Sequence, residues 1–373
     1  MKFEFMKKFV CTLVFSAVFL VCNAVVLYAN DIRIEINGVD VKLDVSPIIQ
    51  DGRVLVPLRA IAEALNMEVD WDSVASVVRL SEKTHATDVI ETVEITEIEL
   101  SGKNITDEKL LKMIARGEIP ANVTSLNLAN NNITDVSPLA ALTDLTELRL
   151  WGNRFEDISP LYPLTNLRSF DTGDNVHFNG DLSVLIYFEN LTTLGLSGGT
   201  WGIPFDLSPV GELTKLERFH LWGGSQFNDL SLFPDPENMT HLTLNGVNIK
   251  DFYPLKNFTN LVSLDLQHSE ISDISVMYLD YLANLTELFL WGNQIVDVAP
   301  LRNLRGLELL ALSGNLIVDV SPLSELTNLT WLSLSDNQIS DISPLYTLKN
   351  LQQVDIHANP ISDNAREVTQ WQH

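Results

Sequence analysis

The sequence predicts an α/β solenoid, with a parallel β-sheet on its concave face and 3-10 or irregular turns on its convex side, preceded by a small α+β domain. The pattern L-x-x-L-x-L-x-x-N-x-I-x-D-I-S-P-L-x-x-L recurs through residues 124–361 with a period of about 22 residues, which is typical of repeat architectures. Residues 31–81 lack this repeat and instead contain short alternating segments separated by turn signals, which predicts the smaller domain. About eleven turns are visible at the asparagine position of the pattern: Asn131, Asn153, Asn175, Gly199, Gly224, Val247, Ser269, Asn293, Asn315, Asn337 and Asn359.

Each turn of the predicted solenoid begins with a short strand. In the last complete turn, Leu332 and Leu334 alternate with Trp331, Ser333 and Ser335, so the leucines face the interior and the other three face outward. Because every turn repeats this alternation, the strands are expected to stack into a parallel sheet. Its outward positions form the concave surface.

The asparagine after each strand has a structural reason. The chain turns inward there, and a side-chain amide both donates and accepts, so it can pair backbone groups that would otherwise be buried without partners. Four successive positions are not asparagine, and the spacings there reach 25 residues, so we expect local irregularity between Asn175 and Trp291. The expected structural ladder consists of Asn131, Asn153, Asn175, Asn293, Asn315, Asn337 and Asn359.

The outer segment of the repeat predicts short helical turns. Ser343 followed by Pro344 has the pattern of an N-cap and a proline at the first helical position, where the missing N–H has no cost. Ser-Pro-Leu recurs in the same register at Ser137, Ser159 and Ser321. The outer wall is therefore expected to be 3-10 or irregular.

This repeat resembles the bacterial leucine-rich repeats of the internalin type, which have the same period and the same D-I-S-P-L outer segment. The resemblance covers residues 124–361. It implies an exported protein that recognises a partner with its curved inner surface.

The N-terminus has the layout of a secretory signal. Lysines precede an apolar run at residues 9–22, and alanines at positions 24 and 29 offer cleavage sites. We therefore expect residues 1–29 to be a signal peptide, with an uncleaved signal as the one route to membrane attachment. Both cysteines, Cys11 and Cys22, lie in this segment, so the mature chain is expected to have no thiol chemistry. This resembles exported proteins of Gram-positive bacteria, secreted or held at the cell surface.

Residues 31–81 predict a small α+β domain. Asn37-Gly38 and Asp51-Gly52 are turn signals between alternating segments, residues 58–65 have helical spacing, and residues 69–71 and 77–80 form a closing strand pair. The core D-G-R-V-L-V-P-L-R-A-I-A-E-A-L resembles the copper amine oxidase N-terminal-like domain. The resemblance implies an accessory or stalk domain and no copper, because amine oxidase catalysis needs several histidines in a large catalytic domain, and the seven histidines here are scattered.

The remaining segments are expected to connect and cap these parts. Residues 82–94 are polar without periodicity and predict a linker. A helix is predicted at residues 107–116, with Leu110, Leu111 and Ile114 on one face and a stop at Gly117. Residues 95–123 are therefore expected to cap the apolar end of the solenoid, and residues 362–373 to form a C-terminal cap or tail.

The composition and motifs exclude several functions. A formal net charge of −25 opposes binding to phosphate backbones, so no nucleic-acid partner is expected. His220 and His241 are one turn apart without convergent carboxylates, so we expect no metal and no cofactor. Residues 195–199 match the G-x-S-x-G pattern of hydrolase nucleophiles but lie on a repeat strand with no helix after them. The sequence thus predicts no catalytic residue and no enzyme.

The candidate binding residues lie at outward strand positions. Trp151, Trp222 and Trp291 each end a strand beside a glycine that leaves the ring uncovered, and exposed tryptophan is unusual because large aromatic side chains are normally desolvated. The few basic side chains gather near the middle of the repeats. The predicted partner-binding set is Arg149, Trp151, Arg218, His220, Trp222, His241, Phe289, Trp291 and Trp331.

Three functions stay open at this point. The preferred function is recognition or adhesion, in which the concave face binds a macromolecule, above all a protein of host or bacterial surfaces. One alternative is a carbohydrate-binding module whose tryptophans stack on the sugar rings of a cell-wall or other polysaccharide. The other is a structural spacer without a ligand.

Overall fold

The computed structural model describes residues 96–361, except 176, 198–205 and 224–226, and in the N-terminal region the backbone of short strands together with Ile61 and Ala62. The chain divides into two compact units, Met1–Val93 and Glu94–His373. The predicted signal, residues 83–95 and the tail at residues 362–373 lie outside the described residues. The helix predicted over residues 58–65 also lies outside them, apart from Ile61 and Ala62.

The first unit contains three antiparallel strand pairs among its described residues. Each predicted turn signal lies between the two strands of a pair, which confirms the predicted strand pairing. The pairs are β1 (Glu35–Ile36) with β2 (Val39–Asp40), β3 (Ile48–Gln50) with β4 (Arg53–Leu55), and β5 (Met67–Asp72) with β6 (Val77–Glu82).

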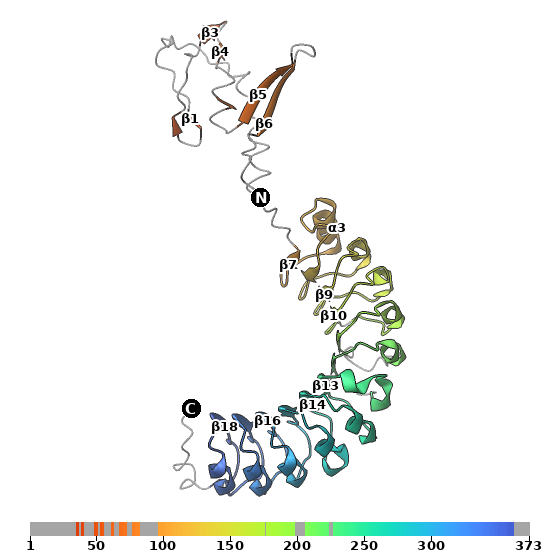
Figure 1. Ribbon diagram of the computed structural model, residues 1–373, viewed down its shortest axis with the longest axis vertical. Coiled ribbons are helices and arrows are strands. Elements are labelled where there is room, and N and C mark those ends of the chain that lie inside the picture. The colour runs from red at the N-terminus through yellow and green to blue at the C-terminus, as the bar shows by residue number, and fades with distance from the viewer. Residues whose placement is uncertain are drawn as a thin grey trace. The chain divides into compact units, whose positions relative to one another are not determined.

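The second unit is built on one parallel sheet of twelve strands, β7 to β18, stacked in sequence order. The strands line the inner side of a curved solenoid, and 3-10 helices line its outer side (Figure 1). This arrangement confirms the predicted solenoid. The strands are β7 (Glu97–Glu99), β8 (Ser125–Asn127), β9 (Glu147–Arg149), β10 (Ser169–Asp171), β11 (Thr193–Ser197), β12 (Arg218–Trp222), β13 (His241–Asn245), β14 (Ser263–Asp265), β15 (Glu287–Phe289), β16 (Leu309–Ala311), β17 (Trp331–Ser333) and β18 (Gln353–Asp355).

The outer wall varies in the middle of the solenoid. Two turns contain a pair of 3-10 helices, and strands β11, β12 and β13 have five residues where the other solenoid strands have three. These changes fall where the asparagine spacing departs from 22 residues, as predicted. The 3-10 helices are η2 (Ser137–Ala141), η3 (Ser159–Leu161), η4 (Ser183–Tyr187), η5 (Ser208–Glu212), η6 (Leu230–Leu232), η7 (Pro236–Asn238), η8 (Tyr253–Asn257), η9 (Ser275–Met277), η10 (Leu279–Tyr281), η11 (Ala299–Asn303), η12 (Ser321–Glu325) and η13 (Ser343–Thr347).

Aspartate, not serine, caps these helices. The backbone N–H of Ser343, the first residue of η13, donates to the carboxylate of Asp341 over 2.8 Å. The predicted serine cap is therefore wrong, because the carboxylate two residues earlier accepts the free N–H through a stronger, charge-assisted hydrogen bond. Ten of the 49 acidic residues thus have a structural role on the loops that lead to the outer wall. The same contact is made by Asp135, Asp157, Asp181, Asp206, Asp229, Asp251, Asp273, Asp297 and Asp319.

Helix α3 (Asp107–Ala115) precedes the first repeat. Its Leu110 is buried, but Leu111 is 56% exposed, so the prediction that the two share one face of the helix is wrong. Gly117 lies two residues beyond the helix in the left-handed region, with φ of 69°. The carboxylate of Asp107 accepts the backbone N–H groups of Thr134 (2.7 Å) and Asp135 (3.0 Å), which ties the helix to the first repeat.

The ladder asparagines connect successive turns. The Nδ2 of Asn315 donates to the carbonyl oxygens of Leu312 in its own turn (2.9 Å) and Leu290 in the preceding turn (3.0 Å). Its Oδ1 accepts the N–H of Ile295 over 3.0 Å, so one buried side chain pairs three backbone groups. Equivalent contacts are made by Asn131, Asn153, Asn293, Asn337 and Asn359.

The ladder changes where asparagine is replaced. Asn175 donates to the carbonyl oxygens of Leu150 and Thr172, but its Oδ1 accepts no hydrogen bond from the described residues. Val247 is buried at its position, and the hydroxyl of Ser269 donates to the carbonyl oxygen of Leu244 over 3.2 Å. Gly199 and Gly224 lie outside the described residues.

Candidate functional site

The strand register arranges the outward side chains in three columns along the concave sheet. Arg218 on β12 lies beside His241 on β13 in the first column, and His220 lies beside Thr243 in the second. Trp222 lies between Ser197 and Asn245 in the third column. Neighbouring strands lie about 4.8 Å apart, so side chains adjacent in a column contact the same part of a partner.

The three candidate tryptophans share the third column. Trp222 ends β12, and Trp151 and Trp291 lie two residues beyond β9 and β15. Their exposed fractions are 37% for Trp151, 38% for Trp222 and 39% for Trp291. Each tryptophan lies three strand spacings from the next, so neighbouring tryptophans are about 14 Å apart.

Each of these indole rings rests against a neighbouring group. His220 stacks on Trp222, and the ring of His268 meets that of Trp291 edge to face at 4.0 Å between centroids. Trp151 lies over Gly173 of the next turn, where an added Cβ would come within 2.6 Å of the indole Cδ1. Each ring is therefore supported on one side in the free protein and is still more than one-third exposed.

The glycines beside the tryptophans have a different role from the one expected. Gly152, Gly223 and Gly292 have φ of 67°, 72° and 69°, in the left-handed region that glycine adopts without strain. The same turn position has positive φ elsewhere, with other residues that tolerate it: Asn130, Asp174, His268, Asp336 and Ala358. Glycine is therefore favoured by the backbone turn, and its effect on tryptophan exposure is secondary.

Arg218, His220 and His241 form what we call the basic patch. The Nδ1 of His220 lies 3.0 Å from the hydroxyl of Thr243, and the Nδ1 of His241 lies 2.9 Å from the hydroxyl of Thr240. Burial lowers the pKa of His220, and the positive charges of His241 and Arg218 lower it further. Burial and Arg218 also lower the pKa of His241, while Glu287 opposes this shift.

Carboxylates flank the basic patch on the concave face but are absent from its own strands. The outward residues of β11 and β13 are neutral or histidine, and those of β12 are Arg218, His220 and Trp222. Asp171 on β10 and Asp265 on β14 border this region. Burial raises the pKa of Asp171, and it raises that of Asp265 to about 6.

A second cluster lies toward the C-terminal end of the sheet. Phe289 is beside Ala311, and Leu309 is beside Trp331, so aromatic and aliphatic side chains cover β15 to β17. We call Phe289, Leu309 and Trp331 the apolar patch; all three are half-buried. Sequence reasoning missed Leu309, although its outward position in an alternating strand carried the signal.

The nine predicted binding residues thus do not form one site. Arg218, His220, Trp222 and His241 lie together, and Phe289, Trp291 and Trp331 lie together. Arg149 and Trp151 stand apart at β9, and the neighbour of Arg149 on the next strand is Asp171.

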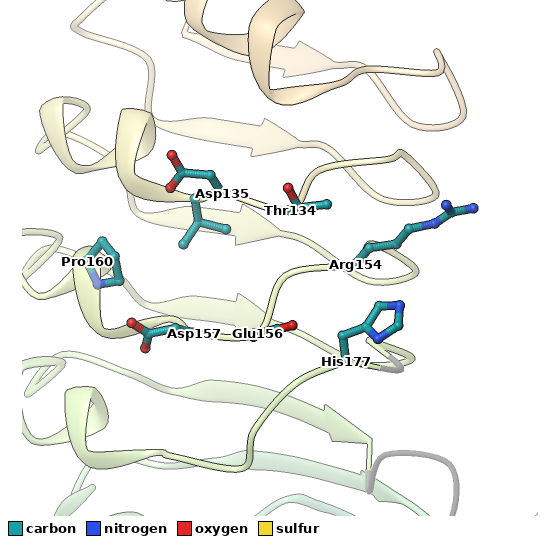
Figure 2. A pocket seen from close by; sticks show the side chains of 8 residues that line it. Thr134, Asp135, Arg154, Glu156, Asp157, Pro160 and His177 are labelled. Carbon is teal, nitrogen blue, oxygen red and sulfur yellow. The ribbon is translucent and has the colours of Figure 1, made fainter.

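A hollow of about 570 Å³ lies away from the concave sheet, on the loops that follow the ladder asparagines. Figure 2 shows Arg154 and His177 on one side of it and Asp135, Asp157 and Pro160 on the other. Asp135 and Asp157 already cap 3-10 helices, and the hollow has charges of both signs. We therefore assign it no ligand.

Two further searches concern metal ions and membranes. Within the described ranges, no group of three or more His, Cys, Asp or Glu side chains is placed to hold a metal ion. None of the helices in that same part of the chain combines the length and the apolar character needed to cross a membrane.

Comparisons with known proteins agree with this architecture. A model of leucine-rich repeats (two copies) matches residues 121–163, 283–325 and 327–365. A model of the copper amine oxidase N-terminal domain matches residues 35–125, so its match extends into the region of α3. No curated protein matches the chain.

Solved structures give the family. The crystal structure of an internalin (inlF) from Listeria monocytogenes is 30% identical over 74% of this chain and 77% of that chain, with a TM-score of 0.58. A TDR receptor, 20% identical over 72% of this chain and 49% of that chain, has a TM-score of 0.53 and shows the fold alone. The repeat, the parallel sheet with its outer 3-10 turns and this similarity show that the chain belongs to the internalin family of leucine-rich repeat proteins, with a copper amine oxidase N-terminal domain before the repeats.

Proposed function

We propose that the chain is an exported recognition or adhesion protein of a Gram-positive bacterium, whose concave sheet binds a protein partner. The observation that carries this proposal is the grouping of half-exposed aromatic side chains with an arginine and two histidines on one face of the sheet. Aromatic and arginine side chains dominate the binding energy of protein interfaces. The family relationship supports the same function.

The geometry of the tryptophans suits tight binding. Because His220 and His268 already hold the rings of Trp222 and Trp291, a partner loses little side-chain entropy when it covers them. A row of three rings spans about 28 Å, which matches the width of a standard protein interface.

The other parts have supporting roles in this proposal. Residues 1–29 direct export, residues 31–81 form the accessory or stalk domain, residues 82–94 link it to the repeats, residues 95–123 cap the first turn and residues 362–373 cover the last. We assign no catalytic residue, cofactor or metal, and no nucleic-acid partner. Membrane attachment occurs only through an uncleaved signal.

One observation favours carbohydrate as a second candidate ligand. The three tryptophans recur at equal steps of three strands, a periodicity that suits a polymer of sugar rings. The apolar patch favours protein, because Phe289 and Leu309 offer no hydrogen bond to sugar hydroxyls.

The test is to present the mature chain to a glycan array and to extracts of host and bacterial surface proteins. A matched variant with Trp151, Trp222 and Trp291 all changed to alanine accompanies it, and Tyr162→Ala on the outer wall is the control. We expect a protein partner that the wild type and the control bind and the triple variant does not. A ligand found only on the glycan array supports the second candidate, and binding that survives in the triple variant refutes the concave surface.

A further inference from the structure

The basic patch is an exception in a strongly acidic chain. The formal net charge is −25, yet the outward residues of β11, β12 and β13 include no carboxylate. Carboxylates return on both sides, at Asp171 and at Asp265. A window of three strands without carboxylates, in which Arg218 has the permanent positive charge, therefore lies between acidic positions of the concave face.

The positive charge of this window is not used inside the protein. Arg218 is exposed and forms no ion pair with any described residue. By contrast, Arg149 lies 3.9 Å from a carboxylate oxygen of Glu147, and Arg305 lies 2.8 Å from one of Glu325. The guanidinium of Arg218 is a planar fork whose geometry matches a carboxylate, so it is available to an incoming acidic group.

The apolar patch lies on the same face, a short distance along the sheet. His241 and Leu309 share the first column and are three strands apart, so about 14 Å separates them. An extended segment of four or five residues spans about that distance. One epitope of a folded partner can therefore contact both patches.

We infer that the partner's epitope is acidic and apolar together: a carboxylate side chain docks on Arg218 and His241, and an aliphatic or aromatic side chain about 14 Å away packs on Phe289, Leu309 and Trp331. This inference rests on the proposed function and specifies the chemistry of its partner.

The surroundings select a protein over a long polyanion. A sulfated glycan would place negative groups along its whole length, and these would meet Asp171 on one side and Asp265 and Glu287 on the other. One or two carboxylates fit within the window. The capping aspartates lie on the loops toward the outer wall, and charges farther than about 8 Å are largely screened at physiological ionic strength.

The test uses a pair of synthetic twelve-residue peptides. The first carries two glutamates separated by four residues from a leucine–phenylalanine pair, and the second has glutamines in place of the glutamates. A heparin oligosaccharide of similar length is the polyanion probe. Affinities for the full mature chain are measured calorimetrically at low salt, with Arg218→Met as the test variant and Arg305→Met, outside the predicted binding set, as the matched control.

We expect the glutamate peptide to bind wild type and Arg305→Met roughly ten-fold more tightly than the glutamine peptide, a difference that Arg218→Met removes. Equal affinity for both peptides, no binding of either at millimolar concentration, or tighter binding of heparin would overturn the inference. These outcomes can be distinguished from a failure of the proposed function. If a captured protein loses binding to the tryptophan variant but binds Arg218→Met as it binds wild type, recognition by the concave face stands and the acidic epitope is refuted.

Discussion

The imidazole of His220 stacks on the indole of Trp222, with ring centroids 5.6 Å apart and planes inclined by 11°. The two residues are two positions apart on β12, so both side chains leave the same face of the sheet. The hydroxyl of Thr243, on the next strand, lies 3.0 Å from Nδ1 of His220 and so also holds the imidazole. The central aromatic group of the concave face is therefore ordered before any partner arrives.

Trp222→Ala is expected to weaken binding to the captured partner by about 2 kcal/mol or more, because a central, partly desolvated tryptophan is a typical interface anchor. The melting temperature should stay close to that of wild type, since the ring is 38% exposed and lies outside the leucine core. Titration calorimetry and thermal unfolding check the two parts. Unchanged affinity would remove Trp222 from the site, and Tyr162→Ala on the outer wall should leave affinity unaltered.

Arg218→Met is expected to raise the pKa of both His220 and His241, because the variant removes a positive charge that lowers each of them. Both values should stay below the ordinary value, since burial is the larger cause. NMR titration of the imidazole carbon-bound protons measures this. Arg149→Met, three strands away, should leave both histidines as they are; the same response in that variant would contradict the assignment.

Asp265→Asn is expected to stabilise the protein near pH 7.5. The folded-state pKa of Asp265, about 6, exceeds its ordinary value of 3.8, so the ionised carboxylate is disfavoured in the fold and its penalty disappears as pH falls through 6. After discounting for partial solvent exposure, the gain should be about 1 kcal/mol at pH 7.5 and vanish by about pH 4. Chemical unfolding at both pH values tests it. Asp341→Asn is the control and should destabilise the protein at neutral pH. Capping hydrogen bonds lower the pKa of Asp341, so its negative charge stabilises the fold there.

Asn315→Ala is expected to cost about 1–3 kcal/mol of unfolding free energy, because it leaves the buried N–H of Ile295 without its acceptor. The variant also removes one of the two amide donors to the carbonyl oxygens of Leu290 and Leu312, which keep Asn293 and Asn337. Ser269→Ala should cost less, since its hydroxyl donates to the carbonyl oxygens of Leu244 and Gln267 and accepts no backbone N–H from the described residues. Urea unfolding of the two variants side by side gives the comparison. Equal losses would show that the amide acceptor contributes nothing to the ladder.

Gly292→Ala is expected to destabilise the protein by about 1–3 kcal/mol, because its φ of 69° is left-handed and an added Cβ would lie 2.4 Å from Nδ1 of His268. Gly211→Ala is the control: its backbone is not left-handed, and its added Cβ would meet nothing closer than 3.4 Å. Thermal unfolding measures both. In a His268→Ala background the Gly292→Ala loss should shrink, since only the backbone strain remains, and an unchanged loss would exclude the contact with His268.

The sequence by itself determined the elements that depend on local periodicity. The alternation at Leu332 and Leu334 is sufficient to predict a buried strand face, and the step from Asn315 to Asn337 is sufficient to predict one solenoid turn. The signal, linker and tail are also sequence predictions, and they lie outside the described residues. Such features need only neighbouring residues and a repeat length, because side-chain direction follows from the strand itself.

The tertiary structure decided which side chains share a surface. Turn lengths between Asn175 and Asn293 vary, so the register that sets His220 beside Thr243 is fixed only when the strands pair. Strand pairing also shows that Arg149 lies beside Asp171 and not near Arg218. Leu309 differs from these residues, because it follows the regular 22-residue spacing to Trp331 and its place was readable from the sequence. Burial then raised the pKa of Asp265 and lowered that of His220, because desolvation depends on atoms contributed by adjacent turns that are distant in sequence.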